Sequence, residues 1–387
     1  MKRGSHLIAA AFALTALSYG LARFAYGLFL PQIRSDLGLG VSAAGWIGGS
    51  AFAAYCLGIV LTFVSNGRLS PRTIVVSAGL AATIGMGLIV LASSARMLGC
   101  GVALAGLSTG LTSPPLASAV AARFNDKDRP RANGFINAGT AAGILFTGLA
   151  AVIAYGAWRE LYSVFALIGA CVTVWLWFAV PAQGAADVAT RFSMKLLQRS
   201  GVLALCSSAF LMGLASTAIW TFGADLLRNE FGFTDINIAW AWIALGAAGI
   251  SGCTTGLLTN RYGTRRMHGL ALLGMAIGIL SLAAATLSPI FGFTAMCVFG
   301  AAYIVSSGVY LIQGIDLFPD RPDLGLGIPF LVLALGQTAG TPLFAVMLET
   351  ANVKTALFVF AAAACSAIFI RPSARAGNLA EPQSNQA

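Results

Sequence analysis

The sequence predicts an all-α membrane protein with twelve transmembrane helices, arranged as two six-helix halves. Of its 387 residues, 58% are apolar and only 9% are charged, and the mean hydropathy is +0.84. Soluble domains carry roughly 25% charged residues, so the composition excludes a soluble enzyme and a disordered chain. The net charge of +10 does not indicate nucleic-acid binding, because the basic residues lie between apolar runs rather than in one patch.

Twelve apolar runs carry the prediction of helices. About 20 apolar residues are needed to cross the hydrocarbon core, and in lipid the backbone polar groups must be satisfied within the segment. The runs do not alternate as barrel strands do, and the first continues through Leu30, which is too long for the apolar region of a signal peptide. The expected spans are residues 7–30, 43–65, 74–94, 97–122, 133–155, 160–181, 202–224, 237–259, 267–288, 290–313, 325–348 and 352–371.

The distribution of Lys and Arg predicts the orientation. With the N-terminus inside, 17 of the 23 Lys and Arg residues fall in inner loops and tails, five fall in outer loops, and Arg23 lies within a span. Because basic residues favour the cytoplasmic side, both termini are expected in the cytoplasm of a bacterium, with the chain in its inner membrane. The seven Cys residues form no metal-ligand spacing and are interpreted as small apolar filler, so no cofactor or metal is expected.

Three matched motifs predict an internal duplication. The arginine pair Arg68 and Arg72 recurs as Arg261 and Arg265, Asp-Arg-Pro recurs at 128–130 and 320–322, and a Gly-x-x-x-Gly pattern recurs at 139–143 and 336–340. The expected domains are residues 1–181 and 202–371, joined by a cytoplasmic linker at 182–201 and followed by a tail at 372–387. Two such halves suit alternating access around a site at the membrane midplane.

The loop after the eighth span resembles a known family. Residues 256–266 read GLLTNRYGTRR, which is similar to the cytoplasmic motif G-x-x-x-D-R-x-G-x-R-R of the major facilitator superfamily. Short segments at 137–140, 158–159, 220–223 and 319–322 (NAGT, WR, WTFG and PDRP) resemble a bacterial branch of efflux permeases, the YbfB/YjiJ type. The resemblance covers essentially the whole chain and implies a twelve-helix transporter.

The resemblance also implies a cytoplasmic gating loop, in which arginines contact neighbouring helix ends. The acid of the motif is replaced by Asn260, and Gly67 stands at that position in the first-half copy. Helix C-terminal carbonyls, which attract cations, are the expected substitute partners, and simple topology-setting charge is the alternative. The gating-loop residues are Arg68, Arg72, Asn260, Arg261, Gly263, Arg265 and Arg266.

Arg23 is the charged side chain placed deepest within a predicted span. A charge inside the bilayer is costly and is a functional candidate. Tyr19, Arg23 and Tyr26 are spaced i, i+4, i+7, which predicts one helical face. We expect this face to line a central cavity where Arg23 attracts an anionic or carbonyl-bearing group. The alternative is that Arg23 extends to the membrane surface or caps a neighbouring helix.

Further polar residues within the spans are candidates for binding substrate. Tyr303, Tyr310 and Gln313 form a stripe with two serines in the tenth span, while Asn137 and Gln337 occupy the corresponding fifth and eleventh spans. Interhelical hydrogen bonding is the alternative explanation. Trp220, near the outer end of the seventh span, is expected either to stack on a substrate or to lie in the interfacial aromatic belt.

These patterns predict a secondary transporter, expected to be an exporter. The cores of the spans contain no Asp, Glu or His, so Asp225 at a helix end is the candidate for proton coupling, which is left open. A buried cation favours a neutral or anionic small molecule. The alternatives are an uptake permease for an organic anion and a ligand sensor of the same fold. An enzyme is not expected; the expected partners are a small-molecule substrate and the lipid bilayer, and a monomer suffices.

Overall fold

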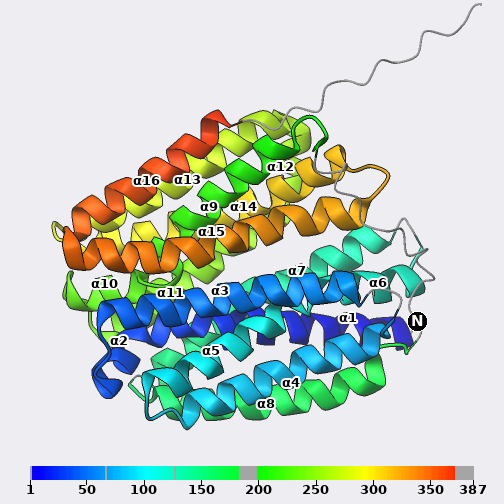
Figure 1. Ribbon diagram of the computed structural model, residues 1–387, viewed down its shortest axis with the longest axis horizontal. Helices are drawn as coiled ribbons and strands as arrows, with labels where there is room; N and C mark the ends of the chain where they lie inside the picture. Colours follow the sequence, from blue (N-terminus) through cyan, green and yellow to red (C-terminus); the bar gives the residue numbers. More distant parts are fainter. Residues whose placement is uncertain (1, 66–67, 126–127, 155, 183–197, 371–387) are drawn as a thin grey trace, which may run out of the picture.

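The computed structural model describes residues 2–65, 68–125, 128–154, 156–182 and 198–370 (Figure 1). Within these ranges the chain forms twelve helical rods, in two bundles that lie one above the other in Figure 1. The lower bundle contains α1 to α8 and the upper one contains α9 to α16. The predicted linker, with Arg191 and Lys195, and the predicted tail lie mostly outside the described residues, so those two boundaries remain predictions.

The first bundle consists of six rods. Four are single helices and two are made of joined segments. Their bounds are α1 (Lys2–Thr15), η1 (Ala16–Phe24) and α2 (Ala25–Leu37); α3 (Val41–Val64); α4 (Pro71–Val90); α5 (Ala95–Gly110) and α6 (Ser113–Arg123); α7 (Arg129–Ile153); and α8 (Trp158–Ala179).

The second bundle also consists of six rods. Their bounds are α9 (Val202–Trp220) and α10 (Gly223–Asn229); α11 (Asp235–Gly249), η3 (Ile250–Thr254) and α12 (Thr255–Tyr262); α13 (Thr264–Ala283); α14 (Pro289–Leu317); α15 (Pro322–Thr350); and α16 (Val353–Phe369).

The predicted all-α membrane fold is confirmed. Ten of the described helices are long and apolar enough to cross a bilayer, and α16 is a shorter apolar helix. The remaining rod is α5 and α6, which is interrupted at residues 111 and 112, just before Pro114 and Pro115. A proline ring has no N–H to donate and is tolerated in the first turn of a new helix. The sequence therefore explains the break as well as the rod.

The first rod departs most from the predicted span. It runs from Lys2 to Leu37, beyond the expected end at Leu30, and its middle is a π-helix from Ala16 to Phe24. A π-helical segment has a wider turn than an α-helix and is often found at functional sites. The face on which a side chain lies therefore changes after Phe24, which affects the predicted stripe of Tyr19, Arg23 and Tyr26.

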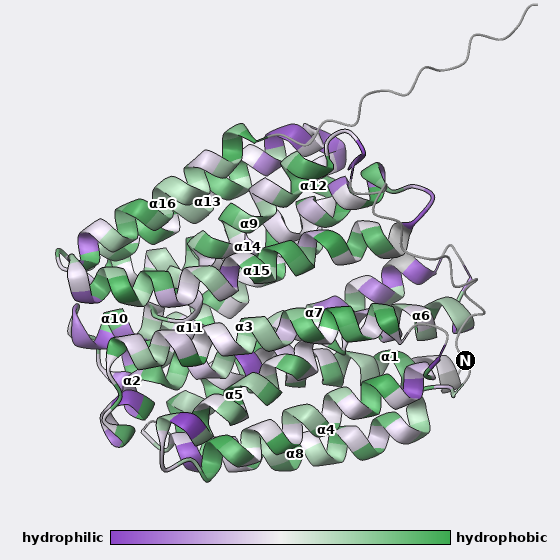
Figure 2. Ribbon diagram, viewed as in Figure 1, coloured by the Kyte–Doolittle hydropathy of each residue, from purple (hydrophilic) through white to green (hydrophobic). Residues whose placement is uncertain are grey.

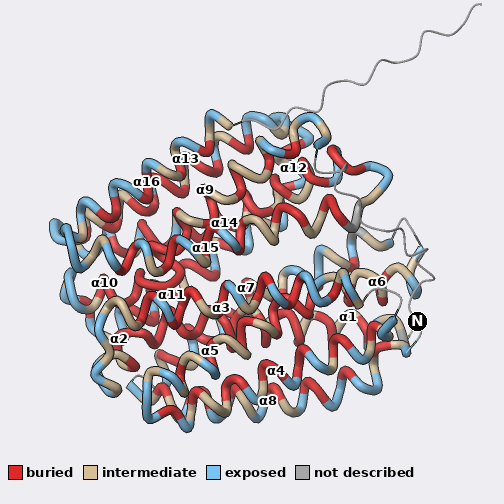
Figure 3. The backbone as a smooth tube through the Cα atoms, in the orientation of Figure 1, coloured by how far each residue is buried: buried red, intermediate tan, exposed pale blue. Residues whose placement is uncertain are grey.

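The surface of the rods matches lipid. Hydrophobic residues predominate along the rods and hydrophilic residues gather toward their ends (Figure 2). Buried residues lie where rods pack together (Figure 3), and the exposed apolar side chains include Leu57, Ile153 and Phe178. In a bilayer the exposed apolar surface meets acyl chains, so its exposure has no penalty.

The two ends of the bundles differ. The connections α3–α4, α6–α7, α12–α13 and α14–α15 lie at one end, which we call the mouth end, and the connections α2–α3, α10–α11 and α15–α16 lie at the other, which we call the closed end. At the closed end the bundles meet through glycines. A side chain on Gly27 would meet the Trp220 carbonyl, one on Gly48 would meet Thr221, and one on Gly45 would meet Ala345. Small residues allow helices in a membrane to approach this closely.

Candidate substrate cavity

A cavity of about 1660 Å³ lies between the two bundles. Its mouth is lined by Arg68, Ser70 and Arg129 from the first bundle and by Asp320 and Arg321 from the second. These residues belong to loops for which the Lys/Arg distribution predicts a cytoplasmic position. The opposite, deep end of the cavity is bounded by Tyr19, Arg23, Phe24, Tyr55 and Tyr303. A cavity between two halves that is open at one end only is the geometry that alternating access requires.

Arg23 stands at the deep end of the cavity, on the π-helical segment. The residue is 6% exposed. Its guanidinium carbon lies 4.4 Å from the centroid of the Tyr55 ring, 4.7 Å from that of Phe52 and 4.9 Å from that of Phe24. Aromatic faces attract a cation, and the attraction is stronger where water is excluded. The rings therefore stabilise the positive charge of Arg23 at the deep end of the cavity without neutralising it.

A hydrogen-bond network joins Arg23 to the second bundle. Arg23 donates through Nη2 to Oε1 of Gln337 at 2.7 Å. Gln337 in turn donates through Nε2 to Ser216 Oγ at 3.1 Å and to the Tyr303 hydroxyl at 3.3 Å. Gln337 is completely buried and lies behind Arg23 rather than in the cavity lining. The network thus links helices α9, α14 and α15 to the first rod at the point where the cavity ends.

Of the residues predicted to bind substrate, the cavity brings together four. Tyr19, Arg23, Asn137 and Tyr303 all line it, and Gln337 supports Arg23 from behind. Tyr19 also pairs through its hydroxyl with Ser113 Oγ at 3.2 Å. The first, fifth and tenth rods thus contribute side chains to one space.

Tyr26 and Trp220 are not among the cavity-lining residues. Tyr26 donates its hydroxyl to the Ala44 carbonyl at 3.0 Å, because the change from π-helix to α-helix turns it away from the face of Tyr19 and Arg23. Trp220 is buried and stacks on Phe24, with ring centroids 4.0 Å apart. It does not line the cavity, and because it is buried it does not face lipid as a residue of the aromatic belt would, so neither expected role describes it. Its ring supports Phe24, which does line the cavity.

Of the rest of the predicted stripe on α14, Ser307 lines the cavity, whereas Tyr310 and Gln313 do not. Tyr310 hydrogen-bonds with Ser208 Oγ at 2.7 Å and packs edge-on against His268, inside the second bundle. Gln313 is buried and does not line the cavity. Ile312 and Ile315 of α14 line the cavity, so residues 310 and 313 lie on a face of this 29-residue helix that is turned away from the cavity. Interhelical hydrogen bonding, the alternative explanation for such residues, describes Tyr310.

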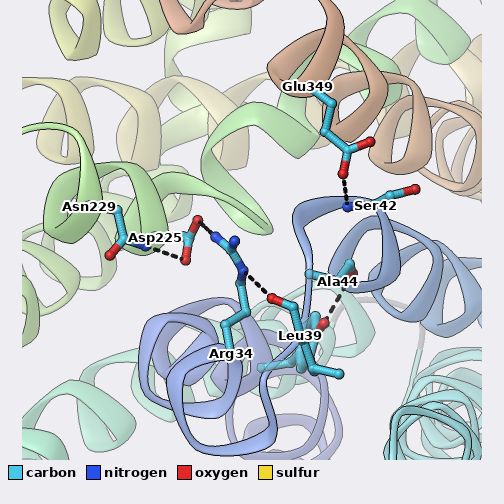
Figure 4. Close-up of polar contacts among 8 residues, drawn as sticks. Arg34, Leu39, Ser42, Ala44, Asp225, Asn229 and Glu349 are labelled. Atoms are coloured by element: carbon cyan, nitrogen blue, oxygen red, sulfur yellow. Dashed lines mark hydrogen bonds and ion pairs between the residues drawn. The ribbon is translucent and has the colours of Figure 1, made fainter.

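An ion pair between the bundles closes the end opposite the mouth. Arg34 on α2 pairs with Asp225 on α10, and its Nε donates to the Leu39 carbonyl at 3.2 Å (Figure 4). Asn229 donates to the second oxygen of Asp225 at 2.9 Å. Nearby, the backbone N–H of Ser42 donates to Glu349 at 2.9 Å (Figure 4). Asp225, the predicted coupling residue, therefore lies in the closure between the halves rather than beside the cavity.

The predicted gating-loop arginines behave differently in the two halves. Arg72 donates through Nε to the Val180 carbonyl at the end of α8, at 2.7 Å, which is the helix-end contact expected of this loop. In the second half Gly263 has a φ of +84°, a conformation that favours glycine. Arg261, Arg265, Arg266 and Asn260 are exposed there. Within the described parts of the chain, no contact from those three arginines to a neighbouring helix end is found.

Asp320 is the acidic residue at the mouth. It forms an ion pair with Arg199, and this pairing lowers the pKa of Asp320 to about 2. A carboxyl whose folded pKa lies below its ordinary value of 3.8 stabilises the fold above pH 4, and this stabilisation is lost as the pH falls through the folded pKa.

We therefore expect the Asp320→Asn variant to differ from the parent protein by a small, constant amount in melting temperature from pH 5 to pH 8. Below about pH 4 the difference should shrink, because the parent carboxyl becomes protonated. Thermal unfolding of the purified protein across this pH range measures it. A difference that changes between pH 5 and pH 7 would contradict the assignment.

Several residues of the site were not predicted. Tyr55, Phe52 and Ser216 surround the Arg23 network, and Arg34 was counted only as one of the five basic residues in the predicted outer loops. Tyr55 is one polar aromatic residue in a long apolar helix, and nothing in its spacing marks it. For Arg34 a signal existed, because the run Gln32 to Asp36 continues a helical pattern from the first span.

The comparisons with known proteins agree with this geometry. The family model described as Major Facilitator Superfamily matches residues 12–204. No curated protein matches the sequence. Among solved structures, the fold is similar to a D-xylose–proton symporter, with a TM-score of 0.78 and 16% identity over 94% of this chain and 96% of that one.

Two other solved structures are similar in fold. The nucleoside transporter NupG gives a TM-score of 0.75 at 12% identity, over 95% of this chain and 98% of that one. A bacterial homologue of the human lysosomal transporter Spinster, in an inward-facing and unoccupied conformation, gives 0.69 at 14% identity, over 95% and 92%. At such identities the likeness concerns the fold.

Twelve rods in two bundles around a cavity open at one end define a multi-pass membrane transporter of the alternating-access class rather than an enzyme. The sequence motif, the matching family model and the shared fold all indicate the same family. The chain belongs to the major facilitator superfamily.

Proposed function

We propose that the protein exports a small neutral or anionic molecule from the cytoplasm of a bacterium across its inner membrane. The cavity that is open toward the arginine-rich loops and ends at Arg23 carries the proposal. Its mouth lies among loops whose basic charge favours the cytoplasmic side, so the conformation described here is inward-open. Release on the other side requires the Arg34–Asp225 closure to separate.

Export is the direction that the resemblance to efflux permeases favours. Uptake of an organic anion by the same cavity is the alternative, and a basic cavity mouth serves either direction. A single cavity cannot distinguish them, because alternating access is reversible and the direction follows the driving gradient. The distinction therefore comes from transport measured under an imposed gradient.

A cysteine already in the cavity offers a test of the proposed orientation and access. Cys253 lines the cavity and is exposed. In a variant with the other six cysteines replaced, a membrane-impermeant maleimide should label Cys253 from the cytoplasmic side of membrane vesicles. Its Cys253→Ser counterpart is the matched control. Labelling only from the outer side would contradict the orientation.

Transport itself is tested in proteoliposomes. A thermal-shift screen of metabolites and drugs identifies ligands, and those ligands are then followed as fluxes under imposed gradients of substrate and pH. Counterflow that maleimide blocks in the Cys253 protein, but not in its Cys253→Ser control, supports alternating access through this cavity. Ligand binding without counterflow would instead favour a sensor of the same fold.

A further inference from the structure

We propose that the deep end of the cavity binds an organic monoanion, with its carboxylate on Arg23 and its planar apolar body against the rings of Tyr19, Phe24, Tyr55 and Tyr303. The proposal rests on the transport function above and names the substrate class of the same cavity. It is carried by the charge balance of the cavity, by the hydrogen bonds of Arg23 and by the rings around it.

The charge balance of the deep cavity is one positive charge without a counter-ion. Arg23 is bound to a neutral amide, Gln337. Among the described residues that line the cavity, the sole acid is Asp320, which lies at the mouth and is paired with Arg199. The buried carboxylate Asp225 is paired with Arg34 at the closed end. Burying a charge without a partner is costly, and an anion in the cavity would supply that partner.

The guanidinium retains hydrogen-bonding capacity. Arg23 uses Nη2 for Gln337, whereas its buried Nε has no hydrogen-bond partner among the described residues. A buried unpaired donor is unfavourable and calls for an explanation. Arginine presents five N–H donors in a planar fork that matches a carboxylate. Gln337, itself held by Ser216 and Tyr303, positions this fork and leaves donors for a ligand.

The surroundings of Arg23 favour an apolar, planar body next to the carboxylate. Tyr19 and Tyr55 meet edge to face with ring centroids 6.5 Å apart, and Phe24 is held in place by Trp220. Aromatic rings offer such offset and edge-to-face contacts to another ring. One cation suits one carboxylate, so a monoanion leaves the occupied deep site neutral.

The mouth adds an electrostatic preference for anions. Among the described residues of the lining, Arg68, Arg129 and Arg321 lie at the mouth together with one acid, Asp320. Clefts lined by charge of one sign raise the local concentration of ligands of the opposite sign. A cation would meet positive charge both at the mouth and at the deep end, so cationic compounds are expected to be excluded.

Three ring-matched probes test the charge preference: indole-3-acetate, indole-3-acetamide and tryptamine, which are anionic, neutral and cationic at pH 7. Binding to the full-length protein in lipid nanodiscs is measured by calorimetry. We expect the anion to bind at least tenfold more tightly than the amide, and tryptamine to bind more weakly than both. Equal affinity for acid and amide, tightest binding of the cation, or no binding of any probe at millimolar concentration would overturn the proposal.

Variants at Arg23 assign the preference to this side chain. Arg23→Gln should weaken binding of the acid at least tenfold while leaving the amide within about twofold, and Arg23→Lys should restore part of the lost affinity. Equal weakening of acid and amide would indicate a merely structural role and would overturn the proposal. Arg96→Gln, which removes the same charge from an exposed arginine outside the cavity lining, is the matched control and should leave binding of both probes unchanged.

Counterflow separates this proposal from the transport function. Probe binding that depends on Arg23, without counterflow in proteoliposomes, would support the substrate class and contradict transport. Conversely, counterflow of neutral ligands that is unchanged in Arg23→Gln would support transport and overturn the substrate class. The two failures therefore give different results.

Discussion

Asp225→Asn is expected to shift the protein strongly toward a state in which the two bundles separate at the end that is closed in this structure. Asp225 and Arg34 form an ion pair between the two bundles, and their side chains are 4% and 18% exposed. Removing one partner of a buried ion pair costs about 3–5 kcal/mol because it leaves the other charge uncompensated. Since Arg34 retains some contact with solvent, we expect about 2–3 kcal/mol, which is roughly 30- to 150-fold in the conformational equilibrium.

The shift is measured as a distance between the two halves. Spin labels on cysteines introduced at Ser35 and Ala351, which are exposed at the closed end on opposite bundles, report separation by double electron–electron resonance. The long-distance population should rise in Asp225→Asn. A charge reversal that combines Arg34→Asp with Asp225→Arg should restore part of the short-distance population.

Asp36 provides a matched control on α2, the helix that carries Arg34. It pairs with Arg159 on α8, so that its ion pair lies within the first bundle. Asp36→Asn removes the same charge but breaks no contact between the halves, and it should leave the distance distribution unchanged. Equal distributions in the Asp225 and Asp36 variants would show that the Arg34–Asp225 pair does not hold the two bundles together.

The structure thus contains two arginines in the first rod with opposite surroundings. Arg34 has a carboxylate partner across the interface, whereas Arg23 has only an amide. The paired arginine lies where the halves are closed, and the one without an acid lies where the cavity ends. This difference supports separate roles in closure and in ligand binding.

Much of the fold was predictable because the bilayer imposes a length on each helix. Runs of about 20 apolar residues predicted the rods, including the interrupted pair α5 and α6. Arg23 was also predictable, since a charge within a span is costly and therefore conspicuous. The boundaries were less accurate at Leu37, because a helix end beyond the hydrocarbon core has no apolar residues to mark it.

The partners of the site residues could not be predicted from the sequence. Arg23 meets Gln337, which is 314 positions away, and Arg34 meets Asp225 at a separation of 191. Neither contact leaves a periodic pattern in the chain. The prediction that Tyr26 shares a face with Tyr19 and Arg23 was wrong for a local reason. The i, i+4, i+7 rule assumes an α-helix, whereas Ala16–Phe24 form a π-helix.

Gly27→Ala is the second substitution expected to have a large effect, through packing rather than charge. A Cβ at Gly27 would meet the carbonyl oxygen of Trp220, and the Trp242 ring would lie 3.4 Å away. The carbonyl belongs to the backbone of α9 and cannot rotate away as a side chain could. Overpacking of this kind costs about 1–3 kcal/mol. Since the contact joins the two bundles, that cost falls on the closed arrangement.

We therefore expect Gly27→Ala to shift the equilibrium toward separation of the bundles at the closed end by roughly 5- to 150-fold, measured with the same Ser35 and Ala351 labels. Gly87→Ala is the matched control, because Gly87 lies within helix α4 with open space around it and alanine favours a helix. Both variants should elute as monodisperse protein. If Gly27→Ala changes the melting temperature but leaves the distances unchanged, the glycine contact serves stability and does not control the opening of the halves.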